Sequence, residues 1–136
     1  MFEVFEHTAD LGVRVEASSF AELLADAASG LSTVIAGDLD QVRPEVVETF
    51  AVPGSDPAWL LFDFLGELHA AFELRRMLFR DFAVTVTDDG IQATARGERY
   101  DPARHVLAHE VKAITQHELS VERSAAGVLA TFIVDI

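Results

Sequence analysis

Two stretches of the chain carry apolar residues at the spacing of an α-helix. Before the first stretch stand Ser19 and Glu22, a pair typical of a helix start because the hydroxyl can accept an N–H of the first turn while the carboxylate reaches back. Gly37 supplies a C-terminal stop, so we predict a helix from about residue 20 to about residue 36. Its apolar positions are Leu23, Leu24, Ala27, Ala28, Leu31 and Ile35.

The second helical stretch follows Asp56 and Pro57. We predict that Asp56 caps this helix and that Pro57 takes its first position, where the missing N–H of proline costs nothing. The predicted buried stripe consists of Leu60, Leu61, Phe64, Leu65, Leu68 and Phe72.

Most of the remaining apolar residues alternate with polar ones, which is typical of strands with one buried face. The predicted strands cover residues 12–17, 46–52, 82–86, 91–95, 119–121 and 128–134. Asp89-Gly90 is a strong signal for a two-residue hairpin turn, and Pro53-Gly54 and Ala126-Gly127 mark further turns. We therefore predict an α+β fold, a layered sandwich of mostly antiparallel β-sheet with two main helices, rather than a doubly wound fold with regular βαβ units.

The composition is that of one globular domain over residues 1–136. Half of the residues are hydrophobic, which is incompatible with a disordered chain. No apolar run reaches the roughly 18 residues that a membrane span needs, and no secretion signal is visible. With no cysteine, disulfides and thiolate metal sites are excluded. We expect a cytoplasmic protein without membrane contact.

The charge is strongly negative: 23 acidic residues against 10 basic ones give a formal net charge of −13. Direct binding to a nucleic acid is not expected, because it depends on Lys and Arg neutralising phosphates. A basic protein surface or a hard cation fits this charge better. The alternative is that the charge serves solubility alone.

The candidate metal ligands lie near the two ends of the chain. Asp10 follows His7-Thr8-Ala9, and Asp135 precedes Ile136, whose main chain carries the α-carboxylate. If the end strands were adjacent, these three oxygen-bearing groups would suit Ca²⁺, Mg²⁺ or Mn²⁺. Taken alone, the first segment is equally typical of a turn and the second of a solvated terminus.

A second group of polar residues comprises Gly97-Glu98, Asp101, His105 and the segment 110–117. Within that segment Lys112 has the charge to contact a phosphate and His117 can donate or accept a hydrogen bond near neutral pH, although a surface Lys is more often an ion-pair partner. His105 and His109 would share a helix face, but without the HExxH order zinc is not expected. The chain has no P-loop, GxGxxG or GxSxG motif.

These segments together resemble the archease family. The residues 7–12 resemble its opening HTAD-x-G motif, and 20–28 are similar to the helix that follows it. The other matching segments are 60–65 (LL-x-x-WL, with Phe64 for Trp), Gly97-Glu98 with Asp101 (GE-x-x-D), 110–117 (EVKAVTYH, with Ile114 for Val and Gln116 for Tyr) and the terminal Asp135-Ile136. Their order and spacing make the resemblance specific over nearly the whole chain.

The resemblance implies a small α+β sandwich without catalytic residues of its own. It implies a protein that activates an RtcB-type RNA ligase, which seals tRNA halves and other RNAs with GTP and Mn²⁺, by promoting ligase guanylylation and repeated turnover. The family's metal site carries over to Asp10, Asp135 and Ile136, and Lys112, His7 and His117 become candidate partner or phosphate contacts.

Two other functions remain as alternatives. One is a metal-dependent hydrolase in which Asp10 and Asp135 bind the metal and His7 or His117 acts as base. The other is an acidic, chaperone-like scaffold without a defined site.

Overall fold

The computed structural model describes residues 1–7 and 10–136, and of His7 only the backbone. The elements in chain order are β1 (Phe2–His7), β2 (Asp10–Ala17), α1 (Phe20–Ala36), the 3₁₀-helix η1 (Leu39–Gln41), β3 (Val46–Pro53), α2 (Pro57–Arg75), β4 (Met77–Thr87), β5 (Gly90–Arg99), β6 (Ala113–Ser124) and β7 (Gly127–Asp135).

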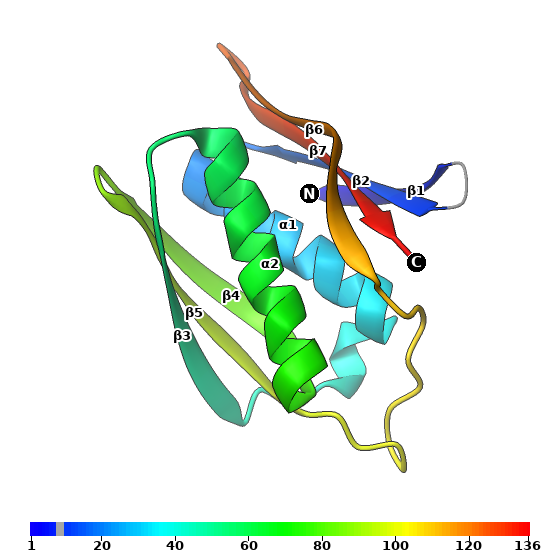
Figure 1. Cartoon of the computed structure of the whole chain (residues 1–136). Coiled ribbons are helices and arrows are strands. Elements are labelled where there is room, and N and C mark those ends of the chain that lie inside the picture. The colour runs from blue at the N-terminus through cyan, green and yellow to red at the C-terminus, as the bar shows by residue number, and fades with distance from the viewer. Residues whose placement is uncertain (8–9) are drawn as a thin grey trace.

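The elements form three layers, with both helices between two antiparallel sheets (Figure 1). One sheet has four strands in the order β1-β2-β7-β6, and the other has three in the order β3-β5-β4. α1 packs mainly against β4 on one side and β2 on the other, while α2 contacts β6 and β3. The α+β class and the antiparallel sandwich predicted from the sequence are confirmed.

α1 is buried on several sides because it lies between the two sheets. All six of its predicted apolar positions are buried, and so are Gly30 and Ser32. A Cβ atom on Gly30 would lie 2.9 Å from Cγ1 of Val13, so glycine allows this helix to approach β2 closely. The predicted stripe of α2 is also buried throughout.

The helix ends agree with the prediction in position but differ in detail. The Ser19 hydroxyl accepts the Glu22 N–H at 3.2 Å, as expected, but the Glu22 carboxylate reaches Ser18 instead of Ser19. Asp56 occupies the N-cap of α2, yet within the described chain its side chain makes no capping hydrogen bond. The predicted N-cap position is therefore confirmed, whereas the predicted side-chain cap is wrong.

The structure differs from the sequence interpretation at three places. The hairpin turn between β4 and β5 is Asp88-Asp89, because Thr87 pairs with Gly90 and the latter already belongs to β5. β1 is a strand that the sequence patterns did not predict. His105 and His109 do not share a helix face, because residues 101–112 contain turns and irregular backbone but no helix.

No helix in the described part of the chain is long and apolar enough to cross a membrane.

Candidate functional site: an acidic pair at the end of the four-stranded sheet

The two aspartates predicted as metal ligands lie side by side. Asp10 begins β2, Asp135 ends β7, and the two residues are direct partners in the antiparallel register. Directly opposite residues of an antiparallel pair project their side chains from the same face of the sheet. The backbone of His7 pairs with Asp10 from the other side, in β1. Residues at the two ends of the sequence therefore meet where the two central strands of this sheet, β2 and β7, lie side by side.

The backbone hydrogen bonds show which kind of pair this is. The Asp135 carbonyl accepts the Lys112 N–H at 2.8 Å, so it points toward β6 and away from Asp10. In β2, the Glu16 N–H donates to the Met1 carbonyl at 3.0 Å, and by alternation Asp10 points its backbone toward β1. The Asp10–Asp135 pair is thus the non-hydrogen-bonded kind, whose Cα atoms lie about 4.5 Å apart.

Ile136 follows Asp135 directly, and its side chain is partly buried against the core. The main-chain carboxylate predicted as the third ligand would therefore lie at the same end of the sheet. We call Asp10, Asp135 and this carboxylate the acidic tip. Among the described residues, no three His, Cys, Asp or Glu side chains are grouped to hold a metal. The main chain of Ile136 is the predicted third donor at the acidic tip.

The other predicted contact residues are less closely associated with the acidic tip. Lys112 is exposed and stands just before β6, joined to Asp135 through its backbone. His117 is exposed in the irregular part of β6, between Thr115 and Ser120, where the register with β7 shifts. The predicted site segment also includes the His7 side chain, Thr8 and Ala9, which lie outside the described residues.

The second polar group forms a buried cluster around Glu98. Its carboxylate accepts hydrogen bonds from the Arg104 guanidinium, from the Arg43 backbone N–H at 2.6 Å and from His105 Nε2 at 3.0 Å. His105 Nδ1 accepts the Asp101 N–H at 2.9 Å, so the ring proton is on Nε2 and is donated to Glu98. This Glu98 cluster ties β5 to the segment between η1 and β3 and to the loop after β5.

Hydrogen bonds in this cluster stabilise the charged form of the Glu98 carboxylate. Burial would raise the pKa of Glu98, but the hydrogen bonds from Arg104, the Arg43 backbone and His105 outweigh it and lower the pKa from 4.5 to about 2. The same contact with Glu98 raises the pKa of Arg104. The residues of the Glu98 cluster form hydrogen bonds with one another, so the structure gives this part of the sequence a structural role.

Comparison with known proteins identifies the family. The model of the Archease protein family matches residues 2–136. The chain belongs to the archease family. It is similar to protein archease of Methanopyrus kandleri, with 42% identity over 139 residues that cover 99% of each sequence.

Solved structures related to this archease share its fold. The solution structure of protein 1598 of Methanobacterium thermoautotrophicum has a TM-score of 0.86 and 29% identity, covering 99% of this chain and 98% of that one. The crystal structure of a Thermotoga maritima archease, described as a possible chaperone, has a TM-score of 0.70. The match covers 100% of this chain and 98% of that one. At 20% identity the second likeness concerns the fold alone.

Two motif glycines of this archease have packing reasons that the sequence patterns did not reveal. The Phe5 ring lies over Gly12, where a Cβ would come within 2.1 Å of the ring. A Cβ on Gly97 would lie 1.8 Å from the Leu78 carbonyl oxygen. Gly12 therefore leaves room for the Phe5 ring of β1 near the acidic tip. Gly97 allows β4 and β5 to pair next to Glu98.

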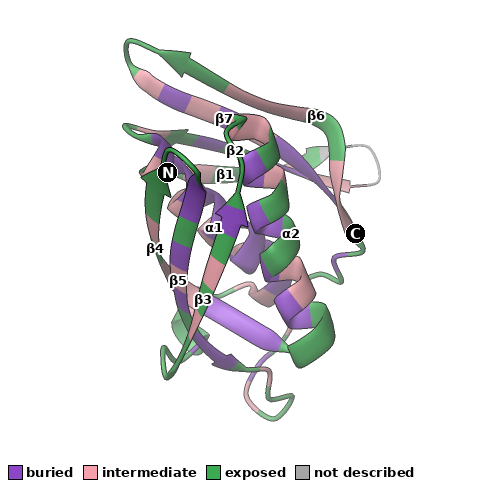
Figure 2. Ribbon diagram, turned by 60° about the vertical axis from the view of Figure 1, so that its left-hand side comes forward, coloured by how far each residue is buried: buried purple, intermediate pink, exposed green. Residues whose placement is uncertain are grey.

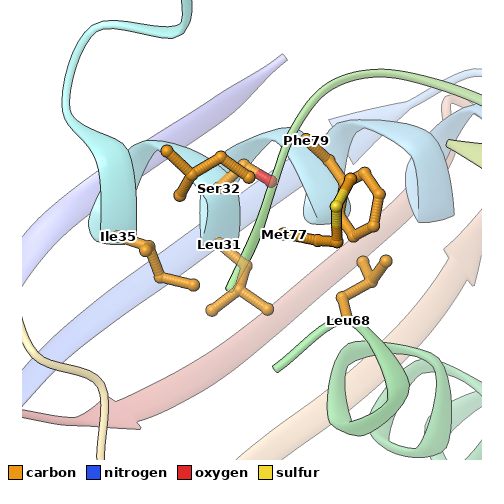
Figure 3. Close-up of a pocket in the computed structure, with 7 residues that line it drawn as sticks. Leu31, Ser32, Ile35, Leu68, Met77 and Phe79 are labelled. Atoms are coloured by element: carbon orange, nitrogen blue, oxygen red, sulfur yellow. The ribbon is translucent and has the colours of Figure 1, made fainter. Parts of the chain in front are cut away.

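An interior cavity of this archease offers no room for a substrate. Side chains from α1, α2 and β4 converge on a space of about 10 Å³ (Figure 3). Ser32 is the polar side chain among those lining it; the others are apolar. A space of this size holds one water molecule at most.

Proposed function

We propose that this chain is a non-enzymatic activator of an RtcB-type RNA ligase in tRNA splicing and RNA repair. In this role it promotes guanylylation of the ligase and multiple turnover. Membership of the archease family supports the proposal. The observation that carries it is the register that sets Asp10 opposite Asp135 beside the end of the chain.

The acidic tip has the donor chemistry of a site for a hard divalent cation. Two carboxylate side chains and a main-chain carboxylate are oxygen ligands of the kind that Ca²⁺, Mg²⁺ and Mn²⁺ prefer. Like charges directly opposite each other in a sheet repel, and a cation held between them would offset that repulsion. When bound, such a cation would supply Lewis-acid polarisation and orientation to phosphate oxygens.

The partner surface would be basic and the site of action would be the ligase, in the cytoplasm. The net charge of −13 would steer the acidic tip toward a positively charged active-site cleft. Lys112 stands exposed beside the tip, so we assign it contact with a phosphate or an acidic partner group. His7 and His117 are further candidates for contacts with the ligase.

The direct test measures guanylylation of a cognate RtcB-type ligase with and without this protein. We expect Asp10→Ala and Asp135→Ala each to reduce stimulation at least about tenfold, as removal of a ligand does when it carries about 1.4 kcal/mol or more. Asp88→Ala is the matched control, because Asp88 is an exposed aspartate in the β4–β5 turn of the other sheet. Full stimulation by folded Asp10→Ala and Asp135→Ala variants would refute the proposal.

Two further measurements test the role of the terminal carboxylate and distinguish the proposed function from its rivals. Appending residues after Ile136 should impair stimulation, and a neutral result would remove the terminal carboxylate from the site. The isolated protein should not hydrolyse phosphoesters with Mn²⁺, whereas metal-dependent turnover would favour a hydrolase. A general acidic scaffold would be insensitive to either single aspartate change.

A further inference from the structure

The three-stranded sheet ends at β3, beside a helix that it covers only in part. Within the described chain β3 pairs with β5 alone, and its other edge borders α2. Figure 2 shows β3 at the margin of the sheet and α2 alongside it, with exposed residues on both. A fourth strand added to this edge would lie over α2.

The register identifies the backbone groups on the open edge. The Gly54 N–H donates to the Asp89 carbonyl at 3.0 Å, in step with the pairing of Val52 with Ile91. Because the backbone direction alternates along a strand, Val47, Thr49 and Ala51 point their N–H and C=O groups away from β5. Pro53 has no N–H to offer at this edge, so the edge that can pair runs from residue 47 to residue 51.

Apolar residues of α2 line the side of the helix next to β3, and there is unfilled space beside Gly66. Trp59 is 47% exposed and packs edge to face on Phe62, with ring centroids 5.6 Å apart. One turn further, a Cβ atom on Gly66 would meet nothing within 4 Å. Phe62, Gly66 and Ala70 line a groove of about 300 Å³ together with residues 51–53 of β3.

The charges at the groove are negative. Asp63 and Glu67 complete its lining and are both exposed, and no basic residue is among the residues that line it. A second copy of this chain would bring the same carboxylates and another net charge of −13 to the groove. Charge complementarity therefore favours a basic occupant over a second copy.

We propose that this groove binds an extended, basic segment of a partner protein as a fourth strand on β3. Main-chain hydrogen bonds to Val47, Thr49 and Ala51 give the segment its direction and register. Its inward-facing apolar side chains fill the place above Gly66 and contact Phe62. Its Lys or Arg side chains lie near Asp63 and Glu67.

The test uses the folded full chain and a synthetic probe, the acetylated and amidated hexapeptide Lys-Val-Lys-Val-Lys-Val. Trp59 is the single tryptophan of the chain and packs on Phe62, which lines the groove, so we expect its fluorescence to report binding. We expect a saturable change for this peptide and none for its Glu-Val counterpart. Methylation of alternate backbone nitrogens of the probe should abolish the change, because strand addition needs its N–H groups. The amides of Val47, Thr49 and Ala51 should exchange more slowly with the peptide bound.

Gly66→Leu is the most informative variant, because its Cβ would meet no atom within 4 Å at a residue that lines the groove. It also removes a glycine from a helix interior, which favours folding. We expect it to weaken binding about tenfold or more. Asp63→Asn with Glu67→Gln should weaken binding several-fold and flatten its salt dependence. Glu122→Gln, an exposed position on β6, is the charge control and should bind normally.

The result is separable from the function proposed for the acidic tip, since Asp10→Ala should bind the peptide like the wild type. Three results would each overturn the proposal: no saturable signal at millimolar peptide, undiminished binding to Gly66→Leu, or equal binding of the N-methylated peptide. The last result would indicate electrostatic adsorption only.

Discussion

The Glu98 carboxylate is buried and accepts hydrogen bonds from Arg104, His105 and the Arg43 backbone, whereas the carboxylates of Asp10 and Asp135 belong to directly opposed residues of two strands. Both groups lie in segments that resemble family motifs. In the Glu98 cluster each charge is matched by a donor from the same chain. In the acidic pair the strand register itself brings like charges together.

The difference separates a carboxylate that is enclosed by donors from two carboxylates that the strand register brings together. A buried carboxylate with complete hydrogen bonding contributes to stability, and its removal leaves donors unsatisfied. Two carboxylates directly opposed across a sheet repel each other, and that repulsion costs free energy. The predictions that follow test this contrast, beginning with the largest expected effect.

Replacing Glu98 with Ala should destabilise the fold by about 3 kcal/mol, because Arg104, His105 and the Arg43 N–H lose a buried acceptor. Urea unfolding followed by circular dichroism measures the change. Glu48→Ala is the control: Glu48 pairs with the half-exposed Arg75, and an exposed pair of this kind contributes at most about 1 kcal/mol. Equal losses in the two variants would contradict a special role for the Glu98 cluster.

The Glu98 cluster should also give the protein a distinct sensitivity to acid. The pKa of Glu98 is lowered from 4.5 to about 2 in the folded state, so its contribution is complete above pH 4.5 and is lost as the pH falls toward 2. Over this window it should steepen the fall in unfolding free energy by about 1.4 kcal/mol per pH unit, the effect of one proton. Unfolding of the wild type and of Glu98→Gln across pH 2–5 compares the slopes. Parallel slopes would show that Glu98 does not titrate as described.

Replacing Asp135 with Asn should leave the stability unchanged or raise it by up to about 1 kcal/mol, since it removes repulsion between directly opposed like charges. Thermal unfolding without added metal measures this. Ca²⁺ or Mn²⁺ should then raise the Tm of the wild type more than that of the variant, because a ligand that binds only the folded state stabilises it. A clear loss of stability in Asp135→Asn would instead give this residue a structural role like that of Glu98.

Much of the fold could be predicted from local patterns. The bounds of α1 and the buried stripes of both helices follow from apolar periodicity and from Ser19, Gly37 and Pro57. The hairpin turn was placed one residue late, because Gly90 has φ 149° inside β5 rather than in the turn itself. β1 was not predicted, because both Val4 and Glu6 are exposed and the apolar Phe5 lies over Gly12 on the sheet's other face.

The candidate site was only partly predictable. The motif resemblance named Asp10 and Asp135, and the register places them opposite each other. The sequence assigned possible chemistry to the segment from Gly97 to His105, where the structure shows a satisfied cluster instead. The role of Arg43 could not have been predicted, because its backbone reaches Glu98 across 55 positions of sequence.

The sequence by itself determined the two helices, most of the strands, the acidic charge and the family. These depend on residue type and on spacing within a few turns or strand repeats. The tertiary structure decided that Glu98 meets donors from distant segments, that Asp10 lies opposite Asp135, and that β3 is left with an open edge over α2. Strand register and the order of strands in a sheet arise from contacts between distant parts of the chain, which no local pattern encodes.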